Sequence, residues 1–311
     1  MLKQHLVLAA KILIALVVFG WVGWKLSHSW NEIQQIPWEP NYLLLTLAGM
    51  CYAVAFVPAG FYWRYVMQTL GQKPGVYETF RAYYIGHLGK YVPGKAMVLV
   101  IRSGLLNHEK TRISVAAASV FMETMTMMAV GAFVAALVVL LWFQHSVHGI
   151  KHENWWTFLT LGIMCGTVLP ILPPVFRFVA KKCRIELEGL RFRTLAVGWV
   201  LNIPVWIMLG VSLWLTMLGF GMESTSIFTE VLLCILAVSM AVVFGFATPI
   251  PGGLGAREGA MVLILAPYFA ANPIGTADPE ALAFVIAAVQ RVVSILAELT
   301  ISVLLARKFV K

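Results

Sequence analysis

A series of long apolar runs restricts what this chain can fold into more than any other feature. A helix needs about 20 mostly apolar residues to cross the hydrocarbon core of a bilayer. We expect membrane-spanning helices at about residues 6–25, 42–62, 114–143, 155–176, 195–218, 228–247 and 281–306. Hydrophobic residues make up 60% of the chain and charged residues only 12%, which excludes an ordinary soluble domain. The pattern predicts one integral membrane domain over residues 1–311, an all-α polytopic protein.

Positive charge is concentrated in the short segments between the apolar runs. The formal net charge is +9, and the densest cluster of cations is Lys181, Lys182, Arg184, Arg191 and Arg193. Loops rich in Lys and Arg face the cytoplasm, so we expect the N- and C-termini to be cytoplasmic. Nucleic acid is not expected as a partner, because the cations do not gather on one polar face.

The segment at about residues 78–106 breaks the pattern of long runs. It has no uninterrupted run long enough to span, yet it is too apolar for a solvated loop, and Pro93 and Gly94 interrupt it. Irregular backbone at membrane depth is tolerated only where protein buries it or a wet cavity lies beside it. We therefore expect a re-entrant pair of short helices that turns near Pro93.

Cations gather around this predicted turn. Lys90, Lys95 and Arg102, together with His87, are suited to bind an anion such as a phosphate group. The alternative is that these side chains only extend to the membrane surface and anchor the segment. The glycine-lysine pattern also resembles the start of a nucleotide-binding P-loop, but Ala96 stands where magnesium coordination needs Ser or Thr. No nucleotide or other cofactor is expected.

A second broken segment, at about residues 248–270, contains two prolines and a run of glycines before a short helix. Arg257 and Glu258 lie at the start of that helix and are candidates for substrate binding. An ion pair inside the membrane is the alternative interpretation of these two side chains. With both broken segments counted, the chain is expected to have about eight transmembrane helices.

Further ionisable residues lie inside predicted spans. Arg291, Ser294 and Glu298 share one face of the last predicted helix, and Glu123 lies in the third apolar run. Ionisable groups at this depth normally face a cavity or form ion pairs, and those on the last helix can pair with each other, with Glu123 or with Glu258. Structural ion pairs and proton coupling are both open for Glu123, Arg291 and Glu298. No catalytic residue is predicted, and the four scattered cysteines indicate neither disulfides nor a metal site.

Two stretches resemble a known family. Gly89-Lys90-Tyr91-Val92-Pro93-Gly94-Lys95 followed by Arg102, and the later Pro249-Ile250-Pro251-Gly252-Gly253-Leu254-Gly255-Ala256-Arg257-Glu258, resemble the signature segments of the lysylphosphatidylglycerol synthase transmembrane-domain family. That domain is the flippase half of multiple peptide resistance factor-type proteins, and it also occurs as stand-alone proteins. The resemblance implies a bacterial cytoplasmic (inner) membrane protein that moves lipids between leaflets, such as aminoacylated phosphatidylglycerol. Hopanoid and polyprenyl-linked lipids are associated with other stand-alone members.

The leading hypothesis is therefore a lipid transporter or flippase for a phosphate-bearing or aminoacylated lipid. The headgroup would be bound by Lys90, Lys95, Arg102 and Arg257. Because the chain ends at Lys311, soon after its last span, no soluble aminoacyltransferase domain is expected. Two alternatives stay open: an intramembrane enzyme that modifies a lipid headgroup, and a non-catalytic scaffold for envelope lipid synthesis. A homo-oligomer or a complex with lipid-synthesis enzymes is compatible with each of these hypotheses.

Overall fold

The computed structural model describes residues 40–92, 97–106, 112–146, 192–222, 226–248, 250–273 and 278–307. Helix is the only regular secondary structure within these ranges. The elements are α3 (Tyr42–Ala55), α4 (Val57–Thr69), α5 (Val76–His87), η1 (Leu88–Tyr91), α6 (Met97–Leu105), α7 (Ile113–Ser146), α9 (Phe192–Gly219), α10 (Ile227–Ala247), η3 (Pro251–Gly253), α11 (Ala256–Ala271) and α12 (Pro279–Arg307).

Five helical stretches in the described ranges are long and apolar enough to cross a membrane. This confirms the prediction of a multi-pass, all-α membrane protein. The stretches are Tyr42–Thr69, Ile113–Leu140, Arg193–Gly219, Ile227–Ala247 and Pro279–Ala306. The spans expected at residues 6–25 and 155–176 lie outside the described residues, so the count of about eight transmembrane helices stays a prediction.

The first described span is longer than the sequence indicates. We expected it to end near Tyr62, because Arg64 interrupts the apolar run two residues later. The helical stretch instead continues to Thr69. Arg64 is accommodated because it is half-buried and its Nε donates a hydrogen bond to the carbonyl oxygen of Pro74 (3.2 Å).

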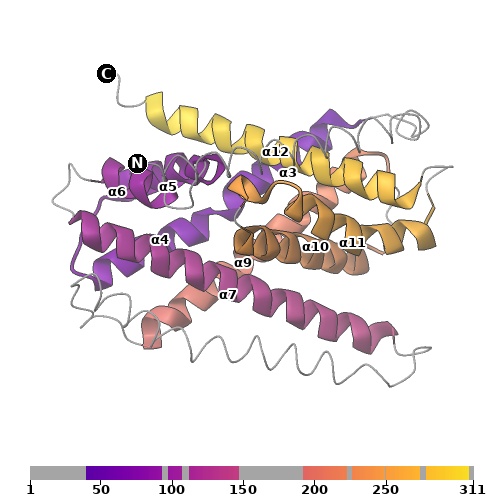
Figure 1. Cartoon of the computed structure of the whole chain (residues 1–311), viewed down its shortest axis with the longest axis horizontal. Coiled ribbons are helices and arrows are strands. Elements are labelled where there is room, and N and C mark those ends of the chain that lie inside the picture. The colour runs from indigo at the N-terminus through magenta and orange to yellow at the C-terminus, as the bar shows by residue number, and fades with distance from the viewer. Residues whose placement is uncertain are drawn as a thin grey trace, which may run out of the picture.

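The spanning helices pack around a core of large buried side chains. α9 lies against α3, α4, α7 and α10, and α12 lies against α3, α5 and α11. Trp63 and Trp206 are fully buried in this core. Figure 1 shows α5 and α6 on one side of the bundle and α10 and α11 on the other, with α12 running past both. The α5–α6 pair and the α10–α11 pair therefore share α12 as a common wall.

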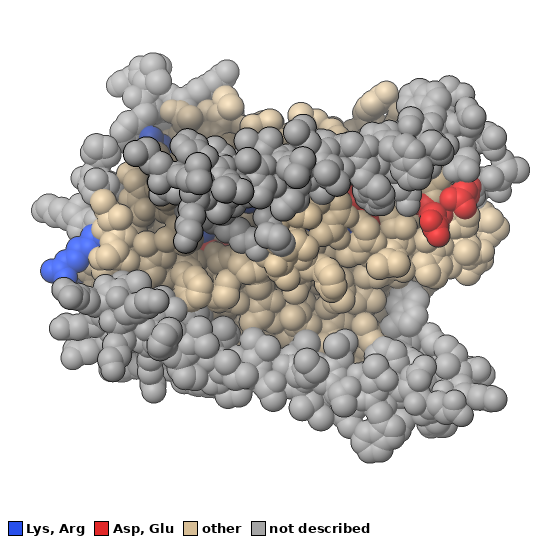
Figure 2. Space-filling view, in the orientation of Figure 1, with Lys and Arg blue, Asp and Glu red and all other residues tan. Residues whose placement is uncertain are grey.

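Charged residues at the surface lie toward the two ends of the bundle. Exposed Lys73, Arg112 and Arg193 lie where α4, α7 and α9 begin or end, and we call this the cationic end. Exposed Asp278 and Glu280 lie at the start of α12, and we call this the acidic end. On the face shown in Figure 2, blue side chains lie toward one end and red ones mainly toward the other. The described side chains that this face shows between the two ends are largely uncharged.

The expected break in the first segment is present. α5 and α6 are two short helices that pack against each other, with the 3-10 turn η1 between them. Residues 93–96, which include the predicted turn and Lys95, lie outside the described residues. α5 starts near the cationic end, where the Tyr77 hydroxyl donates to the carbonyl oxygen of Leu305 (2.7 Å). Its 12 residues place η1 about 18 Å along the bundle from that end.

Candidate functional site

The second broken segment approaches α10 too closely for any residue but glycine. Gly252 and Gly253 have φ angles of 62° and 66°, which other residues rarely adopt. A Cβ atom on Gly253 would lie 2.7 Å from Cα of Gly245 in α10. The glycine run therefore lets the chain leave α10, turn in η3 against that helix, and start α11 in the interior of the bundle.

Glu258 and Arg291 fix the start of α11. The backbone N–H of Gly255 donates to Glu258 Oε2 (2.7 Å), so the carboxylate caps the first turn of the helix. Glu258 Oε1 lies 3.6 Å from Arg291 Nη1 on α12. Arg291 Nη2 also donates to the carbonyl oxygen of Gly252 (2.8 Å). Arg291 thus satisfies backbone that the break leaves without a helical partner.

Arg102 and Glu123 form a second, deeply buried ion pair. Arg102 Nη1 lies 2.7 Å from Glu123 Oε2, and both side chains are at most 3% exposed. The Tyr83 hydroxyl donates to Glu123 Oε1 (3.0 Å). The Arg102 guanidinium also lies over the Tyr83 ring, 3.9 Å from its centroid, and near the Trp63 ring. The pair therefore joins α6 and α7 across a site shielded from water.

A third carboxylate, Glu298 on α12, is paired with the first broken segment. Glu298 Oε1 accepts hydrogen bonds from Lys90 Nζ and from the Tyr52 hydroxyl (2.6 Å). His87 Nε2 lies 3.9 Å from the same oxygen. Glu298 Oε2 is buried and has no hydrogen-bond partner among the residues that the structure describes. One oxygen of this carboxylate is therefore shared by several groups while the other has none.

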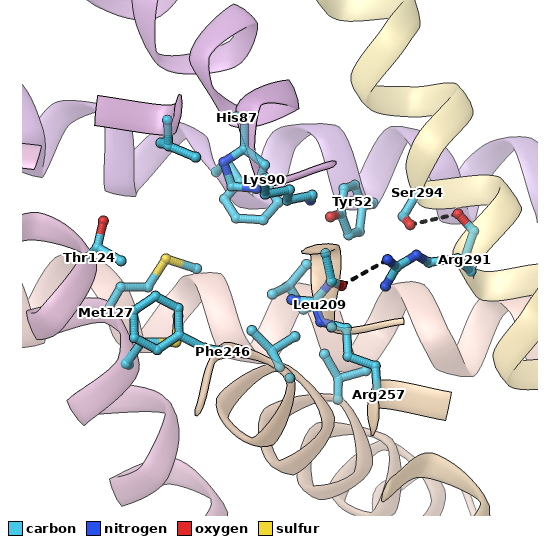
Figure 3. Close-up of a pocket in the computed structure, with 18 of the residues that line it drawn as sticks. Tyr52, His87, Lys90, Thr124, Met127, Leu209, Phe246, Arg257, Arg291 and Ser294 are labelled. Atoms are coloured by element: carbon cyan, nitrogen blue, oxygen red, sulfur yellow. Dashed lines mark hydrogen bonds between the residues drawn. The ribbon is translucent and has the colours of Figure 1, made fainter. Parts of the chain in front are cut away.

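These three pairs surround a cavity of about 460 Å³ between the two broken segments. His87, Lys90, Arg257 and Arg291 line it, and Figure 3 shows them approaching it from different elements. The Tyr91 ring of η1 packs against Gly252 of η3 beside it. Apolar side chains complete much of the wall, among them Val98, Leu99, Met125, Met128, Val242 and Phe246. The cavity is thus apolar with a small number of charged groups.

Arg257 differs from the other lysine and arginine side chains of this cavity. Lys90, Arg102 and Arg291 each have a carboxylate within ion-pair distance. The structure gives Arg257 no ion pair or hydrogen bond with any residue that it describes. The stem of Arg257 packs against Gly245 of α10, and its guanidinium lines the cavity. The described part of the site therefore carries one cation in excess of its carboxylates.

The structure brings together most residues that the sequence singled out. All of the following lie in or beside the cavity: His87, Lys90, Arg102, Glu123, Arg257, Glu258, Arg291 and Glu298. The ion pair between Arg257 and Glu258, which was the alternative interpretation of these two residues, is not found, because Glu258 pairs with Arg291. Lys95 lies outside the described residues. Whether these groups bind a substrate stays a prediction.

Sequence reasoning missed Tyr52, Tyr83 and Gln290. The two tyrosines donate to the buried carboxylates Glu298 and Glu123. Gln290 lines the cavity and exchanges hydrogen bonds with Ser212 and Thr216 of α9. Gln290 lies one residue before Arg291, inside an apolar run, so its polarity could have marked it. The tyrosines carry no such signal, because aromatic residues are common in spanning helices.

The fold and the site together define a class of protein: a multi-pass helical membrane protein with a charged cavity between two broken segments. The chain belongs to the lysylphosphatidylglycerol synthase TM region family, which its sequence matches over residues 8–300. The resemblance seen in the two signature segments is thereby confirmed over nearly the whole chain. Membership indicates a role connected with membrane lipids. A search of curated proteins found no match.

Proposed function

We propose that this protein is a lipid transporter of the flippase type, which moves a phosphate-bearing or aminoacylated lipid between the leaflets of the bacterial cytoplasmic membrane. The observation that carries the proposal is Arg257, a cation that faces the cavity without a described acidic partner. A phosphate or other anionic group would supply the missing negative charge. Arginine suits this role because its planar guanidinium can donate two parallel hydrogen bonds to one phosphate.

The size and lining of the cavity support a lipid headgroup as the ligand. Small-molecule sites usually enclose about 300–1,000 Å³ and are mostly apolar with a few polar groups. The volume of about 460 Å³ falls in that range. Acyl chains need no polar site and can stay in the bilayer. The headgroup alone would then meet Arg257 and its neighbours.

The depth of the site supports movement between leaflets rather than binding at one surface. α5 brings the chain about 18 Å from the cationic end to η1. α11 has 16 residues, so η3 lies about 24 Å from the acidic end. We infer that the α5–α6 pair is re-entrant and that the cationic end, with both termini, is cytoplasmic. A headgroup at this depth is about midway between the two membrane surfaces.

A flipping assay in proteoliposomes tests the proposal. The probe is phosphatidylglycerol with a fluorescent label on an acyl chain, and external dithionite destroys only the label in the outer leaflet. We expect the wild-type protein to bring label to the outer leaflet. Arg257→Gln should slow this movement by at least about tenfold, because a charge-assisted hydrogen bond is worth about 1.5–3 kcal/mol. Arg193→Gln, an exposed change on α9, serves as the matched control and should leave the rate unchanged.

Three outcomes would contradict the proposal. If Arg257→Gln moves lipid at the wild-type rate, Arg257 does not hold the headgroup. If mass spectrometry shows that the lipid is covalently changed, the protein is a headgroup-modifying enzyme. If the wild-type protein neither moves nor changes any anionic lipid, a scaffold role is favoured instead.

A further inference from the structure

Glu298 differs from the other two carboxylates of the site in how its oxygens are used. Glu123 has a partner for each oxygen, and so does Glu258. The partners of Glu298 all lie at Oε1, whereas Oε2 is buried without a partner in the described part of the chain. The residue is 4% exposed. A buried carboxylate oxygen without a hydrogen-bond donor is costly, so its presence needs an explanation.

The groups that face Glu298 come from several elements. Tyr52 of α3, His87 of α5 and Lys90 of η1 surround Oε1. Tyr91 of η1 is within electrostatic range of the same carboxylate. Among these neighbours only Lys90 is ordinarily a cation at neutral pH. Lys90 is therefore the cation among them that pairs with Glu298, and Lys90 lines the cavity.

We propose that Glu298 is the proton-binding site of this protein. An anionic headgroup drives the protonation of Glu298 because it displaces this carboxylate as the ion-pair partner of Lys90. This inference rests on the proposed function and adds a coupling ion to it. When the cavity is empty, Lys90 pairs with Glu298. When a phosphate group enters between Arg257 and Lys90, it replaces the carboxylate as the partner of the lysine. Glu298 then takes up one proton from water.

The charge balance of the site supports this exchange. Before binding, Lys90 and Glu298 together carry no net charge. The negative charge of a bound phosphodiester is balanced by Arg257, the cation in excess. When Lys90 also turns to the phosphate, the Glu298 carboxylate loses its counter-ion, and protonation removes that unpaired charge. Without the proton, the unpaired carboxylate would sit beside a phosphate in a buried site, which is strongly unfavourable. The bond formed is O–H on Glu298, and the bond broken is the one that held this proton in a hydronium ion or buffer acid of the surrounding water. Lys90 stays protonated throughout.

Calorimetry of lipid binding tests the proposal. The probe is short-chain dioctanoyl phosphatidylglycerol, titrated into the purified protein in buffers that differ in ionisation enthalpy. The dependence of the binding enthalpy on the buffer gives the number of protons taken up. We expect about one proton per lipid for the wild-type protein, with affinity that rises as pH falls. Glu298→Gln should take up none, and it should bind severalfold tighter at neutral pH because Lys90 is already released.

Three further variants identify the group that takes up the proton. Glu280→Gln makes the same change at an exposed position of the same helix and should keep the wild-type uptake. His87→Gln should also keep it, because His87 is the other nearby group that can bind a proton. Lys90→Gln should lose the uptake, since Glu298 then lacks its cation before lipid binds. This last variant gives an answer even if Glu298→Gln does not fold.

Two results would overturn the proposal. The first is a wild-type protein whose binding enthalpy does not depend on the buffer. The second is uptake that persists in Glu298→Gln but disappears in His87→Gln, which would assign the proton to the histidine. Lipid movement without proton uptake would contradict the proton site at Glu298 but not the proposed lipid transport. Proton uptake on binding without lipid movement would remove the proposed transport and leave the proton site intact.

Discussion

At the scale of single residues, the cavity depends on ionised side chains that are buried away from water, where a charge has a high free-energy cost. Arg102 is 2% exposed and Glu123 is 1% exposed. Taking both ions out of water costs several kcal/mol each, and their attraction offsets this only with good geometry and further hydrogen bonds. Tyr83 supplies both a hydrogen bond to the carboxylate and a ring beneath the guanidinium. Arg102 and Glu123 are therefore stable together, whereas either alone is not.

This mutual dependence gives a stability prediction. Glu123→Gln leaves the Arg102 charge buried without its counter-ion and should lower the free energy of unfolding by about 3–5 kcal/mol. Replacing both residues with methionine removes both charges, so this double variant should be more stable than Glu123→Gln. Reversible unfolding in mixed micelles, followed by circular dichroism, measures the difference. A double variant less stable than Glu123→Gln would contradict the account, because the ion pair itself would then be the stabilising element.

At the scale of elements, the close approach of η3 to α10 sets the position of Arg257. Gly253→Ala places a Cβ atom 2.7 Å from Cα of Gly245 and also strains a backbone with positive φ. The η3 turn must then move away from α10, and the Arg257 stem packed against Gly245 moves with it. We expect Gly253→Ala to slow lipid movement in the proteoliposome assay. The loss of rate should be larger than the loss of folded protein accounts for.

Gly221 offers a matched control for this prediction. Its φ angle is also positive, at 76°, but a Cβ atom there would meet none of the described residues within 4 Å. Gly221→Ala should therefore cost only the backbone strain, about 1–2 kcal/mol, and leave transport intact. Equal losses of transport in both variants would show that strain alone, rather than the contact with α10, is responsible.

The elements also show where sequence reasoning succeeds and where it ends. Proline and glycine mark both breaks, because they act on local backbone geometry, and the helical period places Arg291, Ser294 and Glu298 on one face. The sequence does not identify the ion-pair partner of each carboxylate. Lys90 and Glu298 are 208 residues apart, and their contact depends on how α12 packs between two broken segments. Local sequence patterns leave such pairings open. The Arg257–Glu258 ion pair, one of two interpretations, is not found, whereas the pairing of Arg291 with Glu258, also among the possibilities, is present.

At the scale of the whole molecule, the two ends of the bundle differ in charge, and this difference predicts the orientation in the membrane. Lys73, Arg112 and Arg193 lie at the cationic end, and Asp278 and Glu280 lie at the acidic end. The positive-inside rule places the cationic end in the cytoplasm. In this orientation, the α5–α6 pair enters the membrane from the cytoplasmic side. The η3 turn between α10 and α11 then lies within the membrane rather than at its cytoplasmic surface.

Single cysteines at the two ends test this orientation. In a background without the four natural cysteines, a membrane-impermeant maleimide should label Glu280→Cys in intact spheroplasts. It should label Lys73→Cys only after the membrane is permeabilised, and Arg193→Cys should behave like Lys73→Cys because both lie at the cationic end. Labelling of both ends from the same side would exclude a bundle that spans the membrane along its long helices. The reverse pattern would place Lys90 and the α5–α6 pair on the outer side, and the cavity would then receive its lipid from the outer leaflet.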